Sequence, residues 1–209
     1  MSATIEQRKY AKGLAVRDKL TDAASALFAS RGYDGCSVSE LAAAAKVSRN
    51  QLFHHFGSKE NLAVACIHKA QLLWRDELIT PAAIFPKSTN RLAFVFDKLA
   101  ELGFGDWDPL RLLVALSAGR AGLPAQPAAE LEALWDELFQ FFRKQFKELK
   151  KSDNARVATK ARVLAGYVMA LLGGIVLQPD TADHDLAQEL FGLLGQQLAL
   201  PLAAIAEAS

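Results

Sequence analysis

Hydrophobic residues recur at helical spacing along most of the chain, and no stretch shows the alternation typical of a strand. The pattern predicts a helix from Leu14 to Arg31, because Gly32 then offers a left-handed C-terminal cap. Met1 to Gly13 lacks periodic apolar residues and is predicted to be a flexible arm or tail. The same helical spacing continues beyond these segments, so the sequence predicts an all-α fold of about nine helices.

Two short helices are predicted next, each with its own N-terminal cap. Ser37 precedes Glu40 by three residues and Ser48 precedes Gln51 by three, which is the S-x-x-E/Q capping box. The remaining turn is very short, and apolar residues of both helices can face a common core: Leu41, Ala44, Val47, Leu52 and Phe56. This arrangement predicts a helix-turn-helix over residues 37–59.

The second of these helices carries hydrogen-bond donors on its exposed face, as a helix entering a DNA major groove does. Arg49 can donate two hydrogen bonds to guanine, and Asn50 can pair bidentately with adenine. Lys59, in the next helix, can point its charge at a phosphate. The predicted DNA-binding residues are Ser37, Val38, Ser48, Arg49, Asn50, Phe53, His54, His55 and Lys59.

At these residues the chain resembles the TetR-type (TetR/AcrR) transcriptional regulators. The resemblance is carried by L-T-D-A-A-S-A-L-F-A-S-R-G-Y-D-G-C-S-V from Leu20 and by V-S-R-N-Q-L-F-H-H-F-G-S-K-E-N-L from Val47. It implies a three-helix helix-turn-helix DNA-binding domain followed by an α-helical ligand-binding and dimerisation domain. Three positions depart from the family pattern: Lys46 stands where glycine is common, Asn50 where a small residue is usual, and Phe53 where tyrosine is more frequent.

The domain limit is predicted after Gly57, with residues 1–57 as arm and DNA-binding domain and 58–209 as the effector-binding and dimerisation domain. Ser58 is predicted to start a helix that reaches about Ile79 and links the two domains. Further helices are predicted over residues 91–103, from Asp108 to about 118, from Pro127 onward, and over 154–178 and 183–206.

The long helix from Pro127 has a broad aromatic stripe, which either core packing or a ligand pocket explains. A mainly apolar pocket between this helix and the one from Ser58 is predicted to take a small apolar effector. Its candidate residues are Cys66, Trp74, Phe94, Trp107, Trp135, Phe139 and Tyr167.

The last two predicted helices are rich in small residues, which allow helix axes to approach closely. They predict a symmetric dimer through a four-helix bundle, and the family resemblance implies the same arrangement. The candidate interface residues are Ala165, Gly166, Ala170, Gly173, Leu194, Gly195 and Leu198.

Composition and charge agree with a folded DNA-binding protein. A chain that is 51% hydrophobic and 22% charged is not a disordered one, and no apolar run has the length of a membrane span. The net charge is +1, but residues 1–68 carry +3 and the remainder carries −2, so the predicted DNA-binding end is the basic one. We expect double-stranded DNA, a second copy of the chain and an unidentified small molecule as partners, and no membrane.

The sequence offers no sign of catalysis or of a cofactor. It contains no glycine-rich phosphate loop, no metal-spaced Cys/His cluster and no G-x-S-x-G motif. Cys36 and Cys66 are far apart, as in a cytoplasmic protein without structural disulfides, and each is either a buried small hydrophobe or a redox sensor. His54 and His55 are adjacent, so their side chains point about 100° apart and do not suit one metal ion.

The sequence predicts a ligand-responsive transcriptional regulator that acts as a repressor. It is predicted to bind a near-palindromic operator as a dimer. The alternative is an architectural or assembly factor of the same fold that binds DNA without a small-molecule inducer. A sensor must keep a pocket in its helical body, whereas the body of an architectural factor is solidly packed.

Overall fold

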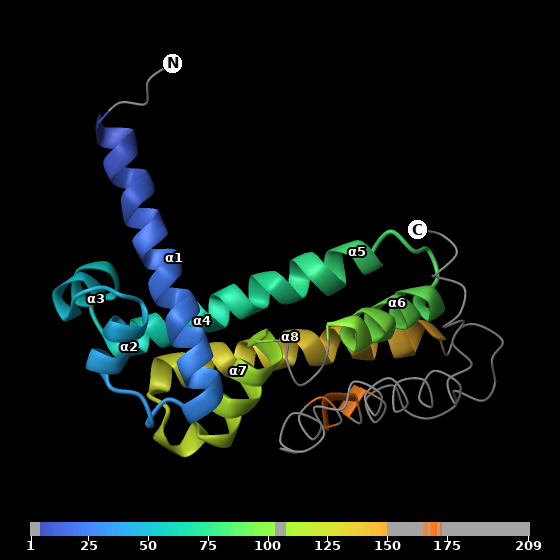
Figure 1. Ribbon diagram of the computed structural model, residues 1–209. Coiled ribbons are helices and arrows are strands. Elements are labelled where there is room, and N and C mark those ends of the chain that lie inside the picture. The colour runs from blue at the N-terminus through green and yellow to red at the C-terminus, as the bar shows by residue number, and fades with distance from the viewer. Residues whose placement is uncertain (1–4, 103–107, 150–164, 167, 171, 173–209) are drawn as a thin grey trace. The chain divides into compact units, whose positions relative to one another are not determined.

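The computed structural model describes residues 5–102, 108–149, 165–166, 168–170 and 172. This part of the chain holds helices and no strand (Figure 1), which confirms the predicted all-α class. Its α-helices are α1 Ile5–Arg31, α2 Val38–Ala44, α3 Arg49–Phe56, α4 Lys59–Trp74, α5 Thr80–Ala82, α6 Ser88–Glu101, α7 Asp108–Ala118 and α8 Ala125–Leu149. A π-helical turn, η1 Arg75–Ile79, and a 3₁₀ turn, η2 Arg120–Gly122, complete the set. The predicted helices over 154–178 and 183–206 lie almost wholly outside the described residues.

The chain forms two compact units, each made of two segments. Unit one comprises Met1–Ala70 and Leu112–Glu132, and unit two comprises Gln71–Arg111 and Ala133–Ser209. The limits between the units fall inside α4, α7 and α8. The predicted domain limit after Gly57 stays a prediction.

In unit one, α1 packs against α2 and α3 (Figure 1), so the two short helices share a core with the long one. The side chains that meet there are apolar, and each is fully or almost fully buried: Leu20, Ala24, Phe28, Leu41, Leu52, Phe56 and Leu62. Burial of several large apolar side chains is the main source of stability for such short helices, which are marginal by themselves.

The first helix begins at Ile5, whereas the apolar pattern places its start at Leu14. Residues 5–13 consist largely of good helix formers, and the side chains of Gln7, Tyr10, Ala11 and Lys12 are exposed, that of Tyr10 at 72%. Hydrophobic periodicity reports burial of a helix face and therefore misses a helical turn that projects into solvent.

Unit two is held by apolar packing and by ion pairs between α8 and the helices before it. Phe96 of α6 and Phe142 of α8 stack with ring centroids 6.1 Å apart. Arg75 donates to both carboxylate oxygens of Glu137, from Nε at 2.8 Å and from Nη2 at 2.9 Å. This hydrogen-bonded pairing with Arg75 lowers the pKa of Glu137 below its ordinary value.

Helical structure continues past the predicted end at Ile79. After α4 the chain makes the π-helical turn η1 and then α5, with Pro81 in the first turn of α5. A proline is tolerated there because the first amides of a helix need no intrahelical partner.

Candidate nucleic-acid interface

Both predicted capping boxes are present, and they fix where α2 and α3 begin. Ser37 Oγ accepts from the amide of Glu40 at 3.2 Å, and the Glu40 carboxylate accepts from the amide of Ser37 at 2.8 Å. Ser48 and Gln51 repeat the pattern, at 3.2 and 2.9 Å. Each box satisfies two amides that would otherwise lack partners at a helix start.

The turn between the two helices is closed by a Schellman motif. The amide of Lys46 donates to the carbonyl of Ala43 and the amide of Val47 to that of Ala42, both at 3.0 Å. Lys46 has φ 57°, in the left-handed region that glycine adopts at least cost. The glycine common at this position in the resembled family therefore has a structural reason, and this chain carries lysine in its place.

The end of α3 is also fixed by local hydrogen bonds. Gly57 has φ 76°, a positive value that glycine adopts at least cost, and its amide donates to the Phe53 carbonyl at 2.8 Å. The side-chain amide of Asn61 then donates to the Phe56 carbonyl at 2.8 Å, while the backbone amide of Asn61 donates to Ser58 Oγ at 3.1 Å. Asn61 thereby joins the end of α3 to the start of α4.

Arg17 of α1, which is not among the residues predicted from the sequence, binds the same end of α3. Its guanidinium donates to the carbonyl of His55 and lies 4.4 Å from the centroid of the Phe56 ring. The last carbonyls of a helix lack intrahelical donors and carry partial negative charge, so a cation is favoured there. The only feature of the sequence that could have indicated this contact is a basic residue on the helix that packs behind α3.

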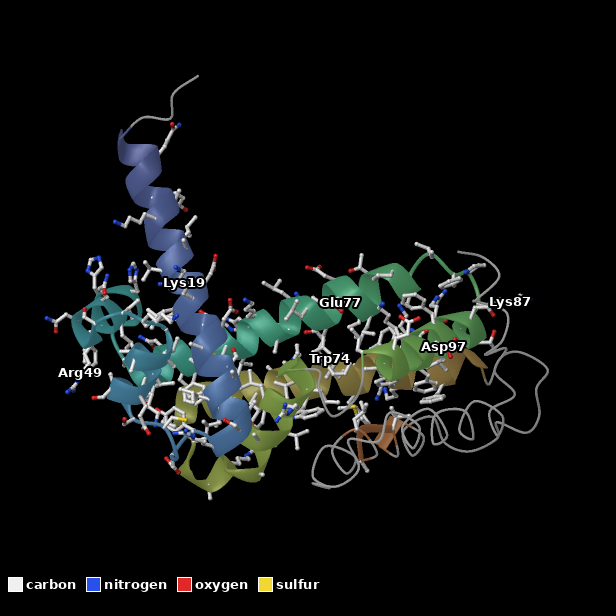
Figure 2. The ribbon with its side chains drawn as sticks, in the orientation of Figure 1. Lys19, Arg49, Trp74, Glu77, Lys87 and Asp97 are labelled. Atoms are coloured by element: carbon white, nitrogen blue, oxygen red, sulfur yellow. The ribbon has the colours of Figure 1, made fainter. Side chains whose placement is uncertain are left out.

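The outer face of α3 carries polar groups, whereas its inner face is buried. Arg49, Asn50 and His54 are exposed, while Leu52 and Phe56 enter the core. Figure 2 shows the Arg49 side chain extending away from the α3 ribbon. The side chain of Phe53 lies among these outer residues and is 42% exposed. The candidate DNA-reading residues thus share one accessible face of one helix.

The ion pairs of unit one leave the guanidinium of Arg49 available for phosphates. Arg31 pairs with Glu40 at 3.2 Å, and Lys69 pairs with Asp22. No described acidic side chain forms an ion pair with Arg49. Its positive charge therefore remains to attract a polyanion.

Lys59 lies in the first turn of α4 with its ammonium nitrogen 3.9 Å from the centroid of the Tyr33 ring. Burial, with smaller contributions from Glu60 and Asp34, raises the pKa of Tyr33 above its ordinary value, so this ring stays neutral near pH 7. A cation–π contact of this kind restricts the lysine to one region of space. The sequence could not show this restriction, because the tyrosine belongs to the loop after α1.

His55 is half-buried beside Arg17, unlike its exposed neighbour His54. Burial is the largest cause that lowers the pKa of His55, and the nearby His54 and Arg17 add to it. The ring of His55 is therefore neutral near pH 7, with one nitrogen still able to donate a hydrogen bond.

Both cysteines are free and buried. The Cys66 thiol donates to the Thr21 carbonyl at 3.5 Å, and burial raises its pKa to about 12. Burial also raises the pKa of Cys36, although Lys59 and Arg31 act against it. Since the thiolate is the reactive form, these surroundings favour the interpretation of both cysteines as small hydrophobes rather than redox sensors.

The predicted effector-pocket residues are only partly described. Trp74 is buried, and Phe94, Trp135 and Phe139 are half-buried, all in unit two, whereas Cys66 belongs to unit one and its thiol meets α1. Trp107 and Tyr167 lie outside the described residues. The pocket stays a prediction, and the packed position of Cys66 makes it unsuitable for a pocket-filling substitution.

The predicted dimer residues are also mostly undescribed. Ala165 is buried, Gly166 half-buried and Ala170 exposed. Gly173, Leu194, Gly195 and Leu198 lie outside the described residues, so the interface stays a prediction.

A groove of about 540 Å³ lies in unit one between α1 and the α2–α3 turn. Lys19 and Asp22 line one side, Lys46 and Gln51 the other. Gln51 is engaged in its capping box and Asp22 is paired with Lys69, so the charged groups of this lining that form no ion pair with a described residue are the ammonium groups of Lys19 and Lys46. Among the residues that the structure describes, no group of acidic, histidine or cysteine side chains could hold a metal ion. None of the described helices has the length and apolar character needed to cross a membrane.

Residues 20–66 match the family model described as "Bacterial regulatory proteins, tetR family". The Transposon Tn10 TetC protein of Escherichia coli is 32% identical over 78 residues, which are 37% of this chain and 39% of that protein. The HTH-type transcriptional repressor AcnR of Corynebacterium glutamicum is 45% identical over 49 residues, which are 23% of this chain and 26% of AcnR. The similarity thus spans less than half the length of these curated relatives.

Similarity in three dimensions extends over most of the chain. The crystal structure of AibR in complex with isovaleryl coenzyme A and operator DNA superposes with a TM-score of 0.72 at 21% identity, covering 85% of this chain and 97% of AibR. At this identity the superposition shows a shared fold: a helix-turn-helix followed by further helices.

Proposed function

Because the chain belongs to the tetR family of bacterial regulatory proteins, we propose that it represses transcription by binding operator DNA and releases that DNA when a small effector binds. It acts through DNA binding and not through catalysis. The observation that carries this proposal is the outer face of α3, where Arg49, Asn50 and His54 are exposed between two fixed helix ends.

In this proposal α3 is the recognition helix and enters the major groove. Its base contacts come from Arg49, which can donate two hydrogen bonds to guanine, and Asn50, which can pair bidentately with adenine. Lys59 and His55 contact phosphates, as do groups at the start of α2 around Ser37 and Val38. Ser48 acts mainly by fixing the first turn of α3, because its hydroxyl already accepts the Gln51 amide.

We further propose that the active form is a homodimer with helices near the C-terminus at its interface. Two recognition helices read a near-palindromic operator when they lie about 34–36 Å apart, one turn of B-DNA. Replacing Gly173 or Gly195 with leucine should then break the dimer, which light scattering would show. An intact dimer in both variants would mean that the interface lies elsewhere.

The effector is proposed to be a small, mainly apolar molecule that binds among the aromatic side chains of unit two. Phe94, Trp135 and Phe139 are half-buried, so each ring keeps accessible apolar surface that a molecule of this kind would contact. AibR, a protein of the same fold, was crystallised with isovaleryl coenzyme A and operator DNA, which supports regulation by a small molecule in this fold.

One experiment tests the proposal and separates it from an architectural factor without an inducer. An operator duplex is selected from a random DNA library with the full-length protein, and tryptophan fluorescence is then titrated with a panel of small apolar and aromatic compounds. A repressor of the proposed kind shows saturable fluorescence changes for some compounds, and these same compounds release the duplex. An architectural factor binds the duplex but releases it with none of them.

A further inference from the structure

The ring of Phe53 is the one large apolar side chain that the described part of α3 leaves exposed, at 42%. It follows Arg49 by four residues and Asn50 by three, so the three side chains lie on adjoining parts of the same helix surface. Leu52 and Phe56 supply the core contacts of α3 and are fully or almost fully buried. Other residues thus supply the core contacts of α3, and a large part of the Phe53 ring remains accessible to a partner.

The chemistry of a phenyl ring limits what it can contact in DNA. It carries no hydrogen-bond donor or acceptor, so it cannot bond to a phosphate or to the polar atoms of a base edge. The major-groove edges of the four base pairs offer one prominent apolar group, the C5 methyl of thymine. An exposed phenyl ring on a helix in that groove is matched to this methyl group.

We propose that Phe53 makes the chain specific for a thymine in each operator half-site by packing against its C5 methyl group. The inference rests on the proposed function, since it requires α3 to lie in the major groove. The rise from Arg49 to Phe53 is roughly 6 Å, a little under two base steps of roughly 3.4 Å. The thymine therefore lies one or two base pairs from the bases that Arg49 and Asn50 contact.

Substitution of deoxyuridine for thymidine tests this directly, because it removes the methyl group and leaves the hydrogen bonds of the base pair unchanged. A duplex selected from a random library by the wild-type protein is prepared with each thymidine replaced in turn, and Kd is measured by fluorescence anisotropy at one salt concentration. At one thymine in each half-site the replacement should weaken binding by roughly fourfold, the effect of losing one buried methyl contact.

The Phe53→Ala variant supplies the second half of the test. It should bind the selected duplex more weakly and lose its sensitivity to deoxyuridine at that one thymine, while keeping the sensitivity that wild type shows at other thymines. Phe53→Leu should retain part of the sensitivity, because leucine keeps an apolar group. His54→Ala, which removes the next exposed aromatic side chain of the same helix, should retain all of it. Circular dichroism of each variant checks folding, which an exposed position should leave intact.

Two results would overturn the inference while leaving DNA binding in place. One is a wild-type protein whose affinity is unaffected by deoxyuridine at every position. The other is a Phe53→Ala variant that binds more weakly yet keeps the full wild-type sensitivity, as a ring packed on the sugar-phosphate backbone would give. Failure to select any duplex would instead overturn the proposed function, and this inference with it.

Discussion

The Ser48 hydroxyl accepts the amide of Gln51, whereas Asn50 and Arg49 are exposed and have no part in the capping boxes. The residues predicted to bind DNA are therefore of two kinds: those that cap the start of a helix and those whose side chains face outward from it. Mutation of a cap changes the position of every outward side chain at once. Mutation of an outward side chain should change one contact.

Asn50→Ala is expected to relax base preference at one position in each half-site, with a loss of about 1–3 kcal/mol of discrimination, because a bidentate contact with adenine is removed. Lys59→Ala is the matched comparison, since it removes a phosphate contact and should weaken operator and random DNA equally. Competition binding between the operator and its single-base variants measures both effects. Equal loss on operator and random DNA for Asn50→Ala would mean that Asn50 does not read a base.

The affinity for DNA is expected to rise as the pH falls from about 7.5 to about 6, close to the ordinary pKa of histidine. Burial, His54 and Arg17 lower the pKa of His55, so the free protein carries this ring neutral. A phosphate contact favours the protonated ring, and binding should therefore take up a proton. Because the pKa of His55 is lowered in the folded protein, protonation of this ring destabilises the fold. The contribution of His55 to folding stability is therefore fully present above its unfolded-state pKa, and it is lost as the pH falls through its folded-state pKa.

Anisotropy titrations across this pH range, with circular dichroism as the check on folding, measure the effect. His55→Asn should remove the part of the dependence that belongs to His55, and His54→Asn should leave that part in place. If the pH dependence of DNA affinity were unchanged in His55→Asn, the proton taken up on binding would belong to another group.

At the scale of the residue, the sequence indicated the outward side chains but not their partners. Arg49 and Asn50 follow from a capped helix and its polar face. The contacts of Arg17 with α3 and of Lys59 with Tyr33 join residues that are 38 and 26 positions apart. No local pattern encodes such contacts, because they depend on how helices pack.

At the scale of the element, the helix ends that carry specific cap residues were predictable and the uncapped end was not. Ser37, Ser48 and Gly32 each marked a helix limit that the structure confirms. The start of α1 has no such residue, and Gln7, Tyr10, Ala11 and Lys12 in its first turns are exposed, so neither capping nor periodicity located Ile5.

Replacing either cap serine with alanine is expected to lower the free energy of unfolding by about 1 kcal/mol, since an amide at the helix start loses its partner. Ser39→Ala is the control, because Ser39 is exposed inside α2 and is not a cap. Urea titration followed by circular dichroism gives the comparison. If Ser48→Ala and Ser39→Ala were equally stable, the capping box would not contribute to the stability of α3.

Lys46→Gly is expected to stabilise the protein by about 0.5–1 kcal/mol, because lysine is strained at φ 57° and glycine is not. Lys46→Ala is the matched control, since alanine removes the charge and keeps the strain. If Lys46→Gly is more stable than wild type and Lys46→Ala is not, the gain comes from relief of backbone strain at this position. Equal stability of the two variants would show that the turn carries no strain at this residue.

At the scale of the whole molecule, unit one draws residues 112–132 together with the first 70 residues of the chain. His68 pairs with Glu130 at 3.0 Å, and a Cβ atom added to Gly122 would lie 1.8 Å from an oxygen of Asp34. Helix content and domain order can be read from periodicity. Which distant segments form one compact unit depends on tertiary packing, which periodicity does not report, and the domain limit predicted after Gly57 stays a prediction.

Effector binding is expected to change the distance between the two recognition helices of the proposed dimer, or the breadth of its distribution. A ligand shifts DNA affinity only by binding two conformations with different affinities, so release of the operator requires a conformation in which the helices no longer match its grooves. A spin label at Ala43→Cys tests this, because Ala43 is exposed on α2 beside the recognition helix. The native Cys36 and Cys66 are buried with raised pKa values and should remain unlabelled, which labelling of the wild-type protein checks.

Pulsed dipolar spectroscopy then compares the dimer alone, with operator, and with a compound that releases the operator. The operator-bound form should give a narrow distribution that fits recognition helices about 34–36 Å apart, and the releasing compound should shift or broaden it. A compound that releases the operator while leaving the distribution of the free dimer unchanged would contradict this mechanism. Its action would then be direct competition with DNA at the outer face of α3, and substitutions on that face, rather than among the aromatic residues of unit two, would abolish its binding.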